Sequence, residues 1–127
     1  MDTIAGDALR HLADVEEISI GFRRPDGSSG STPVWVVRVG DDLFVRSMNG
    51  PRGGWYRRLR ADPDGEVRDG AHAHPVRAQP VTDAGTVEEV TRAYATKYAD
   101  SPYVGSLLDE EAAGATLRLE PLDQPPG

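Results

Sequence analysis

A run of β-branched and apolar side chains near the middle of the chain restricts the fold more than any other feature. It reads Val34-Trp35-Val36-Val37-Arg38-Val39 and is apolar on both faces, which is typical of a strand inside a sheet. Gly40-Asp41-Asp42 then predicts a turn, and Leu43-Phe44-Val45-Arg46-Ser47 predicts the antiparallel partner of a hairpin. The fold must therefore contain a β-sheet that includes this hairpin.

Alternating apolar and polar side chains predict another strand before this hairpin. Ile18, Ile20 and Phe22 fall on one face, and small or polar residues fall on the other. Arg24-Pro25-Asp26-Gly27 follows and predicts a turn, which we expect residues 28–32 to extend into a flexible loop.

A second hairpin is predicted further along the chain. Residues 66–68 lead into Asp69-Gly70, a pair that favours a two-residue turn, so residues 71–81 are expected to be the partner strand. Pro75 and Pro80 lie within that partner and predict an edge strand or a bulged strand, because proline cannot donate to the ladder.

Helical spacing of apolar residues marks two segments. Residues 3–15 carry one apolar stripe and are expected to form a helix. Thr86 and Glu89 have the spacing of a capping box, so a second helix is expected to begin at Thr86, with Tyr94 and Tyr98 on its buried stripe.

Together these elements predict an α+β fold. Residues 55–59 are expected to form a short helix or turn, and residues 115–119 a final strand. About six antiparallel strands, most of them in consecutive hairpins, predict a barrel with two main helices packed outside. A chain of 127 residues is expected to form one domain, over residues 1–122, followed by a disordered tail at residues 123–127.

Composition excludes several classes of function. The chain has no cysteine, which excludes a disulfide framework, a thiolate metal site and a thiol nucleophile. A net charge of −7 argues against nucleic acid and against an anionic membrane as partners. No apolar run approaches the ~20 residues that span a bilayer, and residues 1–4 lack a signal-peptide pattern, so we expect a cytoplasmic protein. His72 and His74 share a strand face, but no third metal ligand is evident, and a solvated pair is the simpler interpretation.

Short motifs in a fixed order resemble a known family. They are Asp26-Gly27-Ser28-Ser29-Gly30, Pro33-Val34, Val45-Arg46-Ser47, Asn49-Gly50, Trp55-Tyr56 and Ala61-Asp62-Pro63. In this order they resemble the split-barrel deazaflavin-dependent nitroreductases. A closer resemblance, to a bacterial family of unknown function in the same split-barrel group, rests on the segments Thr32–Val37, Val39–Asp42, Val45–Ser47, Trp55–Arg58 and Thr116–Leu119.

The resemblance implies a cofactor groove at the mouth of a split barrel. Carried over by position, the residues that would bind FMN or a deazaflavin there are Ser28, Ser29, Ser31, Thr32, Ser47, Asn49 and Gly50, with Trp55 and Tyr56 as wall and helix residues. The relatives keep a Lys or Arg in the first of these loops, whereas residues 28–32 have none. Either Arg23, Arg24 or Arg52 replaces that cation, or the cofactor has been lost.

Arg46 ends the second strand of the central hairpin, beside a glycine-rich loop. Its planar guanidinium is expected to pair with an anionic group of the ligand. Hairpin geometry places residues 28–32, 46–50 and 55–58 at one end of the barrel, which is where we expect the site.

Two functions stay open. The first is a flavin- or deazaflavin-dependent oxidoreductase that acts on a small organic molecule. The second is a cofactor-free split-barrel protein that binds or rearranges a small molecule in the same groove. Trp55 can stack on a ligand ring or pack in the core, and both interpretations stand. Small split barrels of this group usually pair, so we expect a homodimer.

Overall fold

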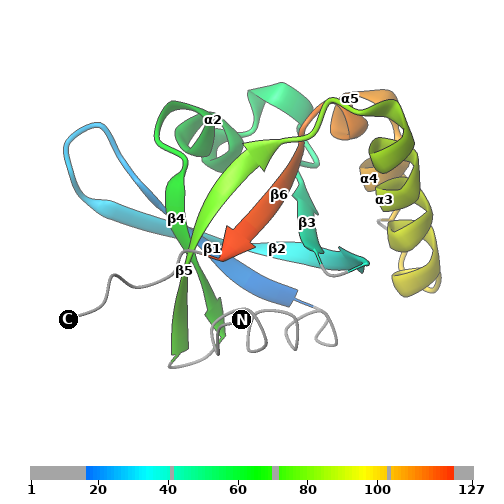
Figure 1. The fold of residues 1–127 in the computed structure, drawn as a ribbon, viewed down its shortest axis with the longest axis horizontal. Helices are drawn as coiled ribbons and strands as arrows, with labels where there is room; N and C mark the ends of the chain where they lie inside the picture. The colour runs from blue at the N-terminus through cyan, green and yellow to red at the C-terminus, as the bar shows by residue number, and fades with distance from the viewer. Residues whose placement is uncertain (1–16, 41, 70–71, 103, 122–127) are drawn as a thin grey trace.

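Six antiparallel strands form a closed barrel in the order β1-β2-β3-β6-β5-β4 (Figure 1). The computed structural model describes residues 17–40, 42–69, 72–102 and 104–121. The strands are β1 Glu17–Arg23, β2 Ser29–Val39, β3 Asp42–Arg46, β4 Asp64–Asp69, β5 His72–Pro80 and β6 Thr116–Pro121. The predicted α+β split barrel is thereby confirmed. The expected helix at residues 3–15 and the expected tail at residues 123–127 lie outside the described residues.

The helices lie outside the barrel. They are α2 Gly54–Ala61, α3 Ala84–Lys97, α4 Gly105–Leu108 and α5 Glu110–Ala113, with a 3-10 turn, η2, at Gly50–Arg52. In Figure 1, α2 lies over one end of the barrel, and α3 to α5 lie along one side. None of the described helices is long and apolar enough to cross a membrane.

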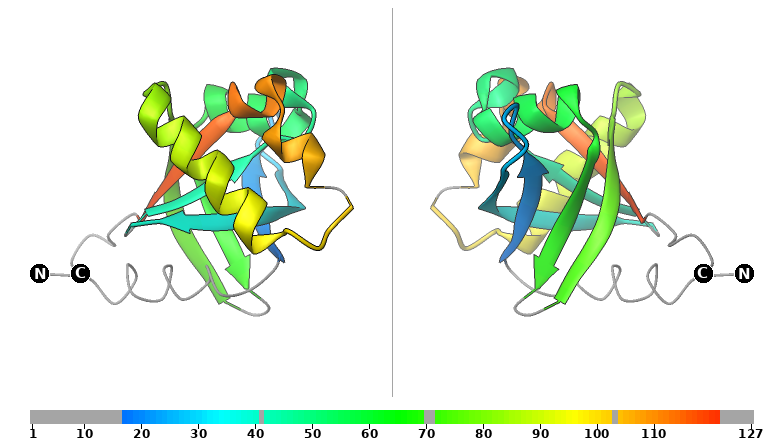
Figure 2. Two further views of the ribbon diagram at one scale, coloured as in Figure 1. Left: turned by 90° about the vertical axis from the view of Figure 1, so that its right-hand side faces the viewer. Right: turned by 90° about the vertical axis from the view of Figure 1, so that its left-hand side faces the viewer.

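The central hairpin is apolar on both faces because it separates two cores. Val36 and Val45 are opposite each other in the β2–β3 ladder, and both are fully buried in the barrel core. Val37 and Phe44 are the next pair, and they join Tyr94 of α3 in a second core. Figure 2 shows α3 crossing the outer face of β2, which is the cover that these outward side chains require.

Residues 29–32 differ from the sequence prediction because they belong to β2 and not to a flexible loop. Thr32 lies opposite Ile20, and Ser31 lies opposite Gly21, in the β1–β2 ladder. Main-chain pairing holds this polar segment extended, so the turn shrinks to residues 24–28, where Gly27 takes a positive φ of 88°.

Strand β5 is not the edge strand that its prolines predicted, because it pairs with β4 on one side and with β6 on the other. The ladder with β6 begins only at Val76, so Pro75 has a strand neighbour on one side alone. A missing N–H is tolerated at such a position. Closure of the barrel by β6, a strand distant in sequence, is what turns the expected edge into an interior strand.

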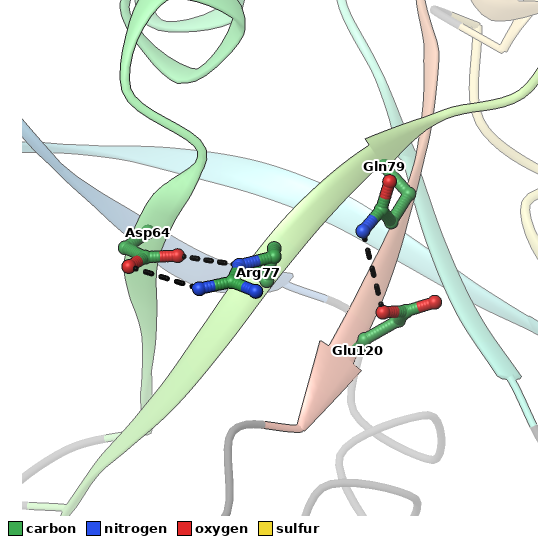
Figure 3. A network of polar contacts seen from close by, with 4 residues as sticks. All are labelled: Asp64, Arg77, Gln79 and Glu120. Carbon is green, nitrogen blue, oxygen red and sulfur yellow. Dashed lines mark hydrogen bonds and ion pairs between the residues drawn. The ribbon is translucent and has the colours of Figure 1, made fainter.

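Polar side chains link β4 to β5 and β5 to β6 (Figure 3). Arg77 of β5 donates to both carboxylate oxygens of Asp64 on β4, at 2.8 and 3.4 Å. This contact lowers the pKa of Asp64 and raises the pKa of Arg77. Gln79 of β5 donates to Glu120 of β6 at 3.4 Å. The ion pair between Arg77 and Asp64 is exposed on both sides, so it adds little to stability.

Helix α3 begins two residues earlier than predicted. Asp83 is its cap, and the Asp83 carboxylate accepts hydrogen bonds from the backbone N–H and the hydroxyl of Thr86, each at 2.8 Å. Thr86 is therefore a donor within the first turn and not the cap itself. Val90, Tyr94 and Tyr98 of the predicted stripe are buried, whereas Val87, also expected there, is half-buried.

Candidate functional site

An open pocket of about 580 Å³ lies between the β1–β2 hairpin and helix α2. It is called the hairpin–α2 pocket below. Its lining residues are Phe22, Arg24, Pro25, Thr32, Gly54, Trp55, Arg57 and Arg58. The volume is within the range of small-molecule sites. The pocket joins two of the three segments that the sequence placed at one end of the barrel.

Local structure explains how the hairpin forms one wall. Phe22 lies opposite Gly30, and Ile20 lies opposite Thr32, so Phe22 and Thr32 are held on adjacent strands. The guanidinium of Arg24 lies over the ring of Phe22, 5.8 Å from its centroid, and donates to the Ser29 carbonyl at 2.6 Å. The wall is therefore fixed by the ladder and by one arginine that bends back from the turn.

Helix α2 forms the other wall. Its first turn follows Gly53, where an added Cβ would lie 2.1 Å from the Ser47 hydroxyl, so only glycine lets the helix start this close to β3. Trp55 is half-buried and packs against the barrel core, with its ring edge-to-face with Tyr56 at 6.3 Å. The core packing of Trp55 is therefore observed, and because the same side chain lines the pocket, its stacking on a ligand ring stays a prediction.

The pocket is positively charged although the chain is acidic. Arg24, Arg57 and Arg58 line it, and no acidic residue occurs among its described lining residues. Neither Arg57 nor Arg58 has a side-chain ion pair with any described residue. The nearby Asp26 carboxylate is already held by the Ser28 hydroxyl and N–H, which lower the pKa of Asp26. The pocket can therefore attract a ligand that combines an aromatic ring with an anionic group.

The predicted site residues within 28–32 do not share one face of β2. Thr32 lines the hairpin–α2 pocket. Ser29 instead lines a smaller pocket of about 220 Å³ between β1, β2 and β4. Ser31 is exposed and alternates with Thr32 along the strand, so the two side chains point to opposite faces. Ser28 is engaged with Asp26 in the turn.

The second segment, residues 46–50, does not line the pocket. Ser47 and Gly50 are buried, and Asn49 is exposed just before η2. An added Cβ at Gly50 would lie 3.1 Å from the Glu111 backbone, which shows how tightly this loop packs on α5. None of these residues is among the lining of the hairpin–α2 pocket.

Arg46 has partners within the protein. Its side chain is only 2% exposed, and its three guanidinium nitrogens donate to Thr116 Oγ1 at 2.8 Å, to the Leu107 carbonyl at 2.9 Å and to the Val87 carbonyl at 2.7 Å. Burial lowers the pKa of Arg46. The guanidinium that the sequence assigned to a ligand thus ties β3 to β6, α3 and α4.

Tyr56 is also turned inward. It is buried in the barrel core, and its hydroxyl accepts a hydrogen bond from Arg60 at 3.1 Å. The pocket residues that sequence reasoning missed are Phe22, Pro25 and Gly54. The signal for Phe22 was its place in the strand before the turn, since any hairpin through Arg24-Pro25-Asp26-Gly27 brings it beside the following strand.

Solved structures share this fold at low sequence identity. A putative pyridoxamine 5'-phosphate oxidase from Listeria innocua is 13% identical with a TM-score of 0.64, and the match covers 95% of this chain and 95% of that chain. An F420-H2 dependent reductase (FDR-A) is 15% identical with a TM-score of 0.62, covering 83% of this chain and 94% of that one. The heme storage protein HutZ from Vibrio cholerae is 13% identical with a TM-score of 0.61, covering 93% and 88%. At such identities the likeness shows the fold alone.

A comparison with curated protein sequences finds no match to this chain. The sequence profile of one family matches residues 8–119, which is most of the chain. That family is described as an uncharacterized protein conserved in bacteria, and the match confirms the resemblance to a bacterial family within the split-barrel group. The chain is therefore a member of the DUF2255 family of bacterial proteins, built on the split-barrel fold.

Proposed function

We propose that this chain is a flavin- or deazaflavin-dependent oxidoreductase that acts on a small organic molecule, and that the cofactor lies in the hairpin–α2 pocket. The observation that carries the proposal is the lining of that pocket, in which Trp55 and Phe22 meet Arg24, Arg57 and Arg58 without a described acidic residue. A flat aromatic ring with a phosphate-bearing tail is a ligand that such a lining fits.

The residues present fit the two ends of such a cofactor. Trp55 offers an apolar aromatic surface for a ring, and the Thr32 hydroxyl can hydrogen-bond a polar tail. Arg24 supplies, from the turn, the cation that residues 28–32 lack. A bound flavin or deazaflavin would supply hydride transfer, and the protein would bind and orient it. Of the three candidate arginines, Arg24 alone is among the described lining residues of this pocket, which supports it as the replacement for the missing cation.

Proteins with the same fold indicate which chemistry to test first. Two of them are an F420-H2 dependent reductase and a putative pyridoxamine 5'-phosphate oxidase. Those activities belong to those proteins, and they make redox chemistry on a flavin-type ring a reasonable first test for this one.

The cofactor-free alternative has its own supporting observation. The Arg24 guanidinium already donates to the Ser29 carbonyl and covers the Phe22 ring, so a phosphate must compete with or share these contacts. A split-barrel protein that binds a small aromatic anion without redox chemistry would use the same pocket.

Titration of the purified protein with FMN and with a deazaflavin distinguishes the two functions. We expect a shift in the visible spectrum of the cofactor and quenching of protein fluorescence. Arg24→Gln should weaken binding about tenfold or more, because a hydrogen bond to a charged group contributes about 1.5–3 kcal/mol. Arg92→Gln, on the exposed face of α3, is the matched control and should bind as the wild type does. Absence of binding of either cofactor at high micromolar concentration would instead favour the cofactor-free protein.

We also propose that the chain forms a homodimer. One fold relative, 16% identical, is described as a domain-swapped dimer. Light scattering at micromolar concentration should give twice the 13.7 kDa of one chain. A mass of one chain under those conditions would refute the dimer without affecting the proposed chemistry.

A further inference from the structure

The smaller pocket of about 220 Å³ between β1, β2 and β4 is called the β1–β4 pocket below. Among the described lining residues it shares only Phe22 with the hairpin–α2 pocket. Two cationic and two anionic side chains line it, and these are Arg23, Arg68, Asp64 and Glu66. The β1–β4 pocket therefore combines both signs of charge, whereas the hairpin–α2 pocket is cationic.

This pocket opens where the β1–β4 ladder ends. Gly21 and Glu66 are the last described pair of that ladder. Arg23 and Asp64 are two residues further toward the turn on their strands, and both line the pocket. Three glycines in the lining add no side chain that could fill the space, and they are Gly21, Gly30 and Gly65. Strand backbone and charged side chains thus form the walls together.

Glu66 lies between two residues that have no polar side chain. Gly21 is opposite it on β1, and Pro75 is opposite it on β5. An added Cβ at Gly21 would lie 2.7 Å from Glu66 Cγ, so glycine is what allows the Glu66 side chain to lie over β1. The carboxylate of Glu66 accepts a hydrogen bond from Arg68, two residues along the same strand. Both side chains of that pair are partly exposed, so a ligand can reach the Glu66 carboxylate.

Arg23 adds a loosely held cation to the same pocket. Its described ion pair with Asp62 is 4.0 Å long, and the Arg23 side chain is 66% exposed. Asp64, in contrast, is held by two hydrogen bonds from Arg77 (Figure 3). Exposed ion pairs add little to stability, so a ligand can replace or share the contact of Arg23 at small cost. The guanidinium of Arg23 is thus available to an anionic group in the pocket.

We propose that the β1–β4 pocket binds a small zwitterion, with the carboxylate of the ligand on Arg23 and its ammonium on Glu66. The four charges of the lining sum to zero, so a simple anion or cation is attracted by two of them and repelled by the other two. A molecule with both charges instead meets an opposite charge at each end. Arg23 and Glu66 are diagonal neighbours on adjacent strands, a relation that separates Cα atoms by about 7–8 Å. A short ω-amino acid is the chemical class that spans such a pair.

A series of ω-amino acids tests both the chemistry and the charge separation. β-Alanine, γ-aminobutyrate and δ-aminovalerate differ by one methylene each, and butyrate and butylamine each keep one charge of γ-aminobutyrate. Proton–nitrogen NMR follows the amides of Gly21 and Gly65, with Gly85 of α3, outside the pocket lining, as the reference. We expect saturable shifts at Gly21 and Gly65 in the millimolar range, and binding of each single-charge analogue that is about fivefold weaker.

Two substitutions separate the ends of the ligand. Glu66→Gln should weaken binding of γ-aminobutyrate about fivefold, because the ammonium loses an exposed ion pair, and Arg23→Gln should do the same through the carboxylate. Glu88→Gln and Arg92→Gln, in an exposed pair on α3, are the matched controls and should bind as the wild type does. Thermal melting without ligand should show that all four variants are folded.

Three results would each overturn this inference. The first is that no ω-amino acid shifts the Gly21 and Gly65 amides at tens of millimolar. The second is that butyrate or butylamine binds as tightly as γ-aminobutyrate, which would indicate a site for a single charge. The third is that folded Glu66→Gln and Arg23→Gln both bind like the wild type. The proposed cofactor pocket is lined by other residues except Phe22, so none of these results affects the proposed function.

Discussion

A single buried arginine connects most of the elements on one side of the barrel. Arg46 ends β3, and its guanidinium reaches β6 through Thr116, α4 through Leu107 and α3 through Val87. Its contact with the Tyr94 ring, 5.7 Å from the centroid, adds to this arrangement. The role that these contacts indicate is to hold helices on the barrel.

Arg46→Ala is expected to reduce the free energy of unfolding by about 3 kcal/mol or more, because the carbonyls of Val87 and Leu107 lose their charged donor in a buried setting. Arg46→Lys should recover only part of the loss, since one ammonium cannot reach three separate acceptors. Urea unfolding measures the change, with Arg92→Ala as an exposed control. If Arg46→Ala unfolds like the wild type but binds FMN more weakly, then Arg46 serves the ligand as the sequence suggested.

Tyr94 should make the protein less stable in alkaline solution. Burial raises the pKa of Tyr94 from the ordinary value of 10.0, and its hydroxyl donates to the Trp35 carbonyl at 2.7 Å. Below pH 10 the tyrosine is protonated whether the chain is folded or not. Above it the unfolded chain loses the proton first, so stability should fall by about 1.4 kcal/mol for each pH unit.

Unfolding measured between pH 8 and pH 11 checks this, with Tyr94→Phe as the comparison. The variant should lose about 1 kcal/mol at neutral pH with the hydrogen bond to Trp35, and its stability should then decline less steeply than that of the wild type. Parallel declines in the two proteins would show that another group is responsible.

Single residues show where sequence reasoning stops. Trp55 packs against the barrel core and also lines the hairpin–α2 pocket, whereas its stacking on a ligand stays a prediction. The burial of Arg46 was not visible, since its acceptors lie 41 to 70 residues away in sequence. No local pattern distinguishes a strand-end arginine in water from one that ties distant elements together.

At the scale of elements, close approach between strands depends on glycine at one point of the β1–β4 contact. An added Cβ at Gly65 of β4 would lie 2.4 Å from the Gly21 carbonyl oxygen of β1. In contrast, an added Cβ at Gly85 in the first turn of α3 meets nothing closer than 3.4 Å. Alanine substitutions at Gly65 and Gly85 are therefore expected to change the free energy of unfolding in opposite directions.

Gly65→Ala should destabilise the protein by about 2 kcal/mol, because the strand backbone must move to admit the methyl group. Gly85→Ala should stabilise it by about 0.5 kcal/mol, because alanine has less entropy to lose in a helix. Chemical unfolding of both variants gives the comparison. A tolerated Gly65→Ala would mean that β1 and β4 can separate locally without loss of the barrel.

Elements defined by local patterns were predicted well, and those defined by distant pairing were not. The β2–β3 hairpin, α2 and the buried stripe of α3 all follow from runs of neighbouring residues. Residues 29–32 look like a loop because their side chains are polar, yet main-chain pairing with β1 makes them a strand. Likewise, Pro75 and Pro80 predict an edge only until β6 is known to lie beside β5.

At the scale of the whole molecule, the charge is divided unevenly. The chain carries −7 overall, whereas Arg24, Arg57 and Arg58 line the hairpin–α2 pocket with no acidic residue among its described lining. An anionic ligand is thus repelled by most of the surface and attracted to one place, which directs binding.

Raising the salt concentration from 50 to 500 mM should weaken FMN binding several-fold, because exposed charges are screened within a few ångströms at the higher ionic strength. Riboflavin, which has the same ring and no phosphate, should show a much smaller change. Isothermal titration at both salt concentrations measures the two dissociation constants. An equal salt effect on FMN and riboflavin would show that the arginines of the pocket do not hold the phosphate.

The position of β6 between β3 and β5 has a consequence for how the protein is made. A ribosome synthesises β6 after the other five strands, and until Leu117 and Leu119 emerge, β3 and β5 each present an unpaired edge. Open edges of this kind invite pairing with other chains. In a nascent chain, the edges of β3 and β5 therefore stay open to pairing with other chains until the final strand, β6, has paired with both of them.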